Sequence, residues 1–97
     1  MIDKKDKYRL RALANNLKPI VIIGKDGLSE NSIIAIKEAI RAHELIKISV
    51  LKTYTGLDIK ELASLICSTI EATLIFSVGR VFVIYKKNKE INAYGVK

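Results

Sequence analysis

A short glycine loop, Gly24-Lys25-Asp26-Gly27, contains the residues of this chain best suited to binding an anion. Glycine lets the backbone come close to a ligand, and a helix that begins just after the loop favours negative charge at its first N–H groups. Lys25 would add a mobile positive charge. The same G-x-x-G pattern also fits an ordinary strand-to-helix turn, so both interpretations stand at this point. The sequence contains neither a Walker A motif nor G-x-G-x-x-G, which removes the signal for nucleotide hydrolysis.

Arg80 is a second candidate for binding, because it follows Gly79 where a tight turn is expected. Arginine presents a planar fork of donors that suits a phosphate or a base edge, and a solvated turn residue is an equally good interpretation. The run that begins at Gly79 partly resembles the RNA-recognition-motif octamer, but Arg80 stands where that octamer has a stacking aromatic residue. We therefore interpret the apolar residues 81–85 as a core strand.

The remaining reactive side chains give little support for enzyme chemistry. His43 is followed by Glu44, but the zinc motif H-E-x-x-H is absent, and Ser29 does not lie in a G-x-S-x-G elbow. Cys67 has apolar neighbours and is expected to be packed rather than reactive. We expect no catalytic residue, no metal site and no cofactor.

The charge of the chain points to a polyanionic partner. Seventeen Lys and Arg residues against ten Asp and Glu residues give a net charge of +7. Residues 1–18 and residues 80–97 each carry +4, whereas the middle of the chain carries −1. Such a balance favours nucleic acid, with a merely soluble basic protein as the plain alternative.

Length and composition restrict the class of protein. Ninety-seven residues are enough for one small domain, residues 1–97. A single cysteine cannot form an internal disulfide, the N-terminus lacks the apolar region of a signal peptide, and no apolar run is long enough to span a bilayer. We expect a cytoplasmic protein that makes no contact with a membrane.

The positions of these residues depend on a regular alternation of helices and strands. A first helix, capped by Asp3, is expected to run to about Asn16. Its inward positions are expected to be Tyr8, Leu13 and Leu17. The β-branched run at 19–23 is interpreted as a buried strand. Ser29 is expected to cap a second helix that ends at about His43. The apolar stripe of that helix comprises Ile33, Ile36, Ala39 and Ile40.

The second half of the chain continues the same pattern. Residues 45–52 alternate between apolar and polar side chains, as a half-buried strand does. Asp58 and Glu61 predict a D-x-x-E capping box for a third helix. The stripe of this helix is Leu62, Leu65, Ile66 and Ile70. Residues 73–78 and 81–87 are expected to be two strands joined by a tight turn.

The resulting order, α-β-α-β-α-β-β, predicts a two-layer α/β domain with a mixed four-stranded sheet. Two β-α-β crossovers make the first three strands parallel and place the second and third helices on one face, and the fourth strand returns antiparallel. The loops at 24–27, 52–56 and 78–80 should therefore converge on one edge of the sheet. If the first helix runs back against the first strand, its lysines lie near that edge too. The basic tail should lie at the opposite end.

Three runs of sequence, 17–29, 42–48 and 78–86, together strongly resemble the CRM domain (chloroplast RNA splicing and ribosome maturation), whose free-standing bacterial form is the YhbY-type protein. The resemblance covers about residues 4–88 and leaves a short basic tail. It implies an RNA-binding domain whose bacterial members associate with precursors of the large ribosomal subunit. It also implies strand order 1-2-4-3, a fold similar to the C-terminal domain of translation initiation factor three, and a G-x-x-G loop at 24–27 like that of KH domains. Asp26 departs from this pattern, because it places an acidic side chain where a neutral or basic one would suit a phosphate better.

We therefore expect a monomeric, non-enzymatic protein that binds RNA, specifically precursor large-subunit rRNA or ribosomal particles, and no small-molecule substrate. The residues expected to contact RNA are Gly24, Lys25, Asp26, Gly27, Arg80, Lys4, Lys5, Lys7, Lys18, Lys52 and Tyr54. The alternatives are a translation or RNA-splicing accessory factor with the same fold, and a protein-interaction module. A protein-interaction module would have its basic residues scattered over all faces of the domain.

Overall fold

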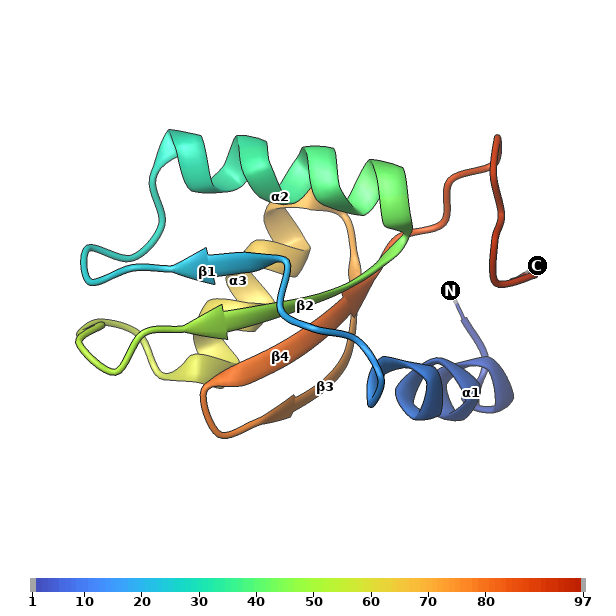
Figure 1. The fold of residues 1–97 in the computed structure, drawn as a ribbon, viewed down its shortest axis with the longest axis horizontal. Helices are drawn as coiled ribbons and strands as arrows, with labels where there is room; N and C mark the ends of the chain where they lie inside the picture. The colour runs from blue at the N-terminus through green and yellow to red at the C-terminus, as the bar shows by residue number, and fades with distance from the viewer. Residues whose placement is uncertain (1, 97) are drawn as a thin grey trace.

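Three helices and four strands make up the computed structural model, which describes residues 2–96 (Figure 1). In chain order they are α1 (Lys4–Ala14), β1 (Val21–Ile23), α2 (Glu30–His43), β2 (Leu45–Val50), α3 (Ile59–Ile70), β3 (Thr73–Val78) and β4 (Val81–Tyr85). The order of elements is the expected one. The molecule is elongated, 37 Å along its longest axis and 22 to 23 Å along the others.

The four strands form one mixed sheet in the order β1-β2-β4-β3, as predicted. β1 pairs with β2 in parallel, and β4 runs antiparallel to both of its neighbours. The last residues of β1 and β2, Ile23 and Val50, are directly paired. Val81, the first residue of β4, pairs with Ser49 and with Val78. The carboxyl ends of the three parallel strands therefore meet at one edge of the sheet, which is called the loop edge below.

The larger core lies between the sheet and the layer formed by α2 and α3. Alternate residues of β2 point into it, and the helices contribute their predicted stripes. Leu65 is the exception: it is 45% exposed, so its predicted inward position is wrong. Successive helical residues are separated by ~100° around the axis, and the buried face is instead completed by Ala63 and Cys67.

Helix α1 packs on the opposite face of the sheet. Leu10 and Ala14, one turn apart, contact a second core formed by residues of β2, β3 and β4. Tyr8 and Leu13 are exposed, so two of the three predicted inward positions are wrong, whereas Leu17 is partly buried as expected. The prediction that α1 runs back against β1 is also wrong. Its neighbours are β2 and β3, because the apolar pair on α1 is buried by the middle of the sheet.

Strand β1 is shorter and less buried than the sequence suggested. It has three residues and forms an edge of the sheet, pairing with β2 alone. Val21 and Ile23 are buried under α2, but Ile20 and Ile22 are 47% and 63% exposed. The predicted burial is therefore wrong for Ile20 and Ile22, because α1 does not cover this part of the opposite face.

Two of the three predicted helix caps are formed. Asp3 accepts a hydrogen bond from the N–H of Asp6 at 2.8 Å, and Ser29 accepts one from the N–H of Ser32 at 3.1 Å. Asp58 occupies the N-cap position of α3, but its side chain makes no capping hydrogen bond. Its backbone, at φ −51°, differs from the more extended conformations of the other two caps, and the predicted capping box is wrong.

The segment after β4 folds back on the domain, although its sequence carries no pattern that predicts this. Its anchor is Glu44, a fully buried residue between α2 and β2. The Glu44 carboxylate accepts hydrogen bonds from the backbone N–H groups of Asn88 (2.8 Å) and Ala93 (2.6 Å). Val96 is buried in the second core, and the ring of Tyr94 meets that of Tyr85 edge to face at 6.3 Å.

Candidate nucleic-acid interface

The three loops expected to meet at the loop edge do lie side by side (Figure 1). The N–H of Leu51 donates to the carbonyl of Ile23 at 2.9 Å, which joins the loop after β2 to the end of β1. The N–H of Val50 donates to the carbonyl of Arg80 at 2.8 Å, which joins β2 to the β3–β4 turn. The prediction that these loops converge is confirmed.

The glycine loop is a closed turn between β1 and α2. The N–H of Gly27 donates to the carbonyl of Gly24 at 3.1 Å, and Gly27 has a φ of 77°, which side chains of L-residues rarely tolerate. Lys25 and Asp26 project from the turn as exposed residues. Two residues later, Ser29 begins α2, whose first-turn N–H groups therefore lie beside the turn.

Tyr54 connects the glycine loop to the loop after β2. A Cβ atom at Gly27 would lie 3.1 Å from Cε1 of Tyr54, and one at Gly56 would lie 2.9 Å from its hydroxyl oxygen. The ring is partly buried and packs against the larger core. Tyr54 is thus placed to hold the two loops together, and both glycines provide the space that its ring requires.

Arg80 belongs to the β3–β4 turn and reaches the neighbouring loop. Its Nη1 atom donates to the carbonyl of Leu51 at 3.1 Å, and the side chain remains exposed. A guanidinium carries five N–H donors, so this contact leaves capacity for a phosphate. Lys52, in the loop that Arg80 contacts, is exposed as well.

Acidic groups offset much of the positive charge at the loop edge. Lys25, Lys52 and Arg80 share it with Asp26 and with two carboxylates at the starts of α2 and α3, Glu30 and Asp58. These acids suit the helix N-termini, but they leave the loop edge with little net charge. Any anion bound there depends on the close backbone approach at the glycine turn and on individual cations, more than on a broad positive field.

Three of the lysines expected near this edge lie elsewhere. Lys4, Lys5 and Lys7 are on α1, which packs over the middle of the opposite face, and Lys4 and Lys7 border a separate hollow of about 330 Å³ beside Ile75. Lys18 precedes β1 and so lies at the other end of that strand from the glycine turn. The predicted place of Lys4, Lys5 and Lys7 near the loop edge is wrong, because α1 packs against β2 and β3 and does not run along β1.

The other reactive side chains are placed as packing predicts. Cys67 is buried in the larger core, and burial raises the pKa of its thiol to about 11. His43 is exposed in the last turn of α2. Within residues 2–96, no three His, Cys, Asp or Glu side chains are grouped to hold a metal ion, and no helix is long and apolar enough to cross a membrane.

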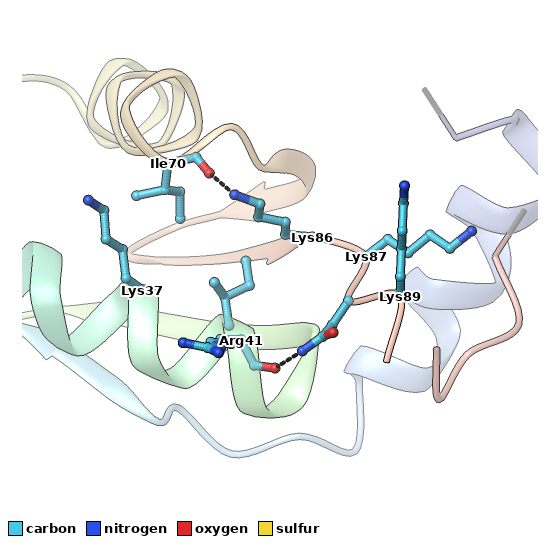
Figure 2. Close-up of a pocket in the computed structure, with 8 residues that line it drawn as sticks. Lys37, Arg41, Ile70, Lys86, Lys87 and Lys89 are labelled. Atoms are coloured by element: carbon cyan, nitrogen blue, oxygen red, sulfur yellow. Dashed lines mark hydrogen bonds between the residues drawn. The ribbon is translucent and has the colours of Figure 1, made fainter. Parts of the chain in front are cut away.

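A second cluster of cations, which the sequence did not indicate as a site, lies at the opposite end of the molecule. It combines residues of α2 with the chain after β4 around a groove of about 550 Å³ (Figure 2). Its basic side chains are Lys37, Arg41, Lys86, Lys87 and Lys89. The excess of positive charge in residues 80–97 could have indicated this cluster, but the basic residues of α2 that complete it are more than 40 residues away in the sequence.

The CRS1 / YhbY (CRM) domain family matches residues 2–86, nearly the whole chain. The chain belongs to this family. The "Probable RNA-binding protein YqeI" of Bacillus subtilis is 38% identical over 90 residues, which cover 93% of each chain. An "RNA-binding protein" of Haemophilus influenzae is 33% identical, and the aligned region covers 92% of this chain and 89% of that protein.

A solved structure shares the fold. The solution structure of the hypothetical protein SAV1595 from Staphylococcus aureus superposes with a TM-score of 0.77 at 39% identity, covering 91% of each chain. The family match confirms the resemblance carried by residues 17–29, 42–48 and 78–86. The match includes the whole loop edge but stops at Lys86, so Lys87 and Lys89 of the second cluster lie beyond it.

Proposed function

We propose that this CRM-family protein binds RNA at its loop edge and acts, without catalysis, in assembly of the large ribosomal subunit. The observation that carries the proposal is the junction of three loops at the carboxyl ends of the parallel strands, held by Tyr54 and Arg80. The names of the relatives from Bacillus subtilis and Haemophilus influenzae support RNA as the ligand. The family resemblance supports precursor large-subunit rRNA as the particular RNA.

The proposed contact is with the sugar-phosphate backbone. The turn at Gly27 brings the chain to the start of α2, where helix N–H groups favour a phosphate. Lys25, Lys52 and Arg80 would each neutralise one phosphate from a different side of the turn. Such contacts position RNA without reading its sequence, so selectivity for an assembly intermediate would come from RNA shape.

A second candidate function uses the same surface on a different RNA: that of a translation or splicing accessory factor. Sedimentation of a cell extract, followed by detection of this protein in each ribosomal fraction, separates the two. Our proposal expects the protein in the cytoplasm, bound as a monomer to immature large-subunit particles. Its presence mainly with translating ribosomes, or with non-ribosomal RNA, would favour the alternative.

A nuclease control makes this measurement specific for RNA. If RNA carries the association, ribonuclease treatment of the extract should move the protein to the top of the gradient. Retention in a large particle after complete digestion would indicate a protein contact instead and would contradict the proposal. The same sedimentation can be carried out on an extract from a strain whose protein carries the loop-edge changes Lys25→Ala and Arg80→Ala. We expect that variant to leave the particle fractions.

A further inference from the structure

The groove at the end of the molecule opposite the loop edge is bordered by α2, the end of α3 and the chain after β4 (Figure 2). We call it the basic groove. Ile40 and Ile70 are its apolar residues, and its cations are Lys37, Arg41, Lys86, Lys87 and Lys89. Among the described residues, no acidic side chain lines it. This composition contrasts with the loop edge, where acids and bases nearly balance.

The walls of the basic groove are held by specific hydrogen bonds. Nζ of Lys86 donates to the carbonyl of Ile70 at 2.8 Å, which ties β4 to the end of α3. Nδ2 of Asn88 donates to the carbonyl of Arg41 at 2.8 Å, and the N–H of Asn88 is held by Glu44. The segment that carries the last two lysines is therefore fixed against α2. Glu44 itself is buried, with both carboxylate oxygens engaged by the backbone.

The remaining cations lack a counter-charge within the fold. In residues 2–96 the structure contains one ion pair, Arg9 with Asp6, and it lies on α1. Lys37 and Arg41 are one helical turn apart on α2, where like charges repel weakly. Bringing Lys87 and Lys89 to the same groove adds to that repulsion, which a bound polyanion would relieve.

The chemistry of the lining suits the phosphates of a nucleic acid better than its bases. Most of the cations are lysines, which bind phosphate as point charges from flexible stems. No aromatic residue in the described lining offers a surface for base stacking. An RNA strand that is bound at the loop edge and extends along the strands reaches this groove at their opposite end.

We propose that the basic groove is a second RNA site, which binds backbone phosphates irrespective of sequence and extends the contact made at the loop edge. This inference rests on the proposed RNA-binding function. Lys87 and Lys89 complete the site from beyond the residues that match the CRM family.

The test neutralises the groove and compares it with an equal loss of charge elsewhere. The groove variant combines Lys37→Gln, Arg41→Gln, Lys87→Gln and Lys89→Gln, and leaves Lys86 because it bonds to Ile70. The control removes four positive charges outside both sites and outside the residues expected to contact RNA, as Arg9→Gln, Arg11→Gln, Lys47→Gln and Lys60→Gln. Thermal unfolding of both variants checks that the fold is retained.

Affinity for a large-subunit rRNA fragment is measured for each protein between 50 and 200 mM salt. Four lost phosphate contacts should make the slope of log affinity against log salt shallower by about 2 to 3, at ~0.7 per contact on a single strand. We expect the groove variant to bind at least about tenfold more weakly at low salt, with a smaller change in the control. Cross-linked RNA should map to peptides that contain Lys87 and Lys89.

The other outcomes separate this inference from the proposed function. Equal losses in the groove variant and the control would mean that net charge alone matters, and would overturn the groove as a site. Normal binding by the groove variant, with weakened binding by Lys25→Ala/Arg80→Ala, would overturn the groove but leave the loop edge. An absence of RNA binding by the unaltered protein would overturn both. Normal RNA binding with loss of an acidic peptide ligand would assign the groove to protein.

Discussion

Tyr54 lies directly against Gly27, where a Cβ atom would be 3.1 Å from the Cε1 atom of the ring. The two residues belong to different loops, and Gly27 also has a φ of 77°. The glycine turn is thus shaped by two constraints, a backbone conformation suited to glycine and an aromatic neighbour that fills the space above it. Both constraints can be tested by substitution.

Replacement of Gly27 by valine should destabilise the fold and weaken RNA binding. A β-branched side chain at positive φ costs on the order of 2 kcal/mol, and contact with Tyr54 adds to this. Urea denaturation measures the free energy of unfolding. Gly24→Ala is the matched control, because a Cβ at Gly24 meets no atom within 4 Å and its φ is not positive. Equal losses in the two variants would contradict the role given to Gly27.

The double variant Lys25→Ala/Arg80→Ala should lose RNA affinity with little change in stability. Both side chains are exposed, and surface changes usually alter the free energy of unfolding by less than ~0.5 kcal/mol, with about 1 kcal/mol for the Arg80 contact to Leu51. Two lost phosphate contacts should reduce the salt slope by about 1.4. Filter binding at several salt concentrations measures this, and an unchanged slope would argue that the loop edge binds no phosphate.

The predictions made from sequence succeeded where the pattern was local. Residues 45–52 alternate, and the structure shows a strand over Leu45–Val50 in which the apolar side chains are buried and the polar ones are partly buried. Ser29 and Asp3 cap their helices because capping depends on residues three positions apart, although the equally local pair Asp58 and Glu61 does not form its predicted capping box. The convergence of the three loops followed from the parallel direction that β-α-β crossovers impose on the first three strands, which holds without knowledge of side-chain packing.

The predictions failed where position depends on contacts between distant segments. The apolar residues of α1 fit more than one face, and the choice of Leu10 and Ala14 over Tyr8 and Leu13 is made by the second core. The basic groove brings residues 37–41 together with residues 86–89, and the sequence of neither segment predicts that it lies beside the other.

Glu44→Ala should be strongly destabilising. The substitution leaves the N–H groups of Asn88 and Ala93 without their acceptor in a partly buried setting, at a cost of about 3 kcal/mol. The same change at Glu38, exposed on α2, should cost less than ~0.5 kcal/mol and is the control. Equilibrium denaturation in urea compares the two. Equal effects would mean that the segment after β4 contributes little to the fold.

Truncation after Lys89 should destabilise the protein through the same contact. It removes the N–H of Ala93 and the side chains of Tyr94 and Val96 from the second core, for a loss of about 2 to 4 kcal/mol. Combined with Glu44→Ala, the loss should be less than the sum of the separate losses, because both changes break one interaction. Simple additivity in this double-mutant cycle would show that Glu44 and the truncated segment act independently.

Cys67 should make the protein less stable in alkali. Burial raises the pKa of the folded thiol from 9.0 to about 11, so above pH 9 the unfolded chain loses a proton that the folded protein retains. Stability should fall between pH 9 and pH 11, by up to about 1.4 kcal/mol per pH unit for this group. Burial also raises the pKa of Tyr85, which adds to the loss at higher pH. Cys67→Ala should remove the part that begins near pH 9, and an unchanged profile would contradict it.

The buried carboxylate of Glu44 also bears on the order in which the protein is made. A ribosome synthesises Glu44 about fifty residues before Ala93, whose N–H the carboxylate requires. Until that later segment has left the exit tunnel, the Glu44 carboxylate lacks these N–H donors, and water must solvate it in their place. We therefore expect the nascent chain to keep this junction open and wet, and to complete its fold only when residues 88–93 arrive.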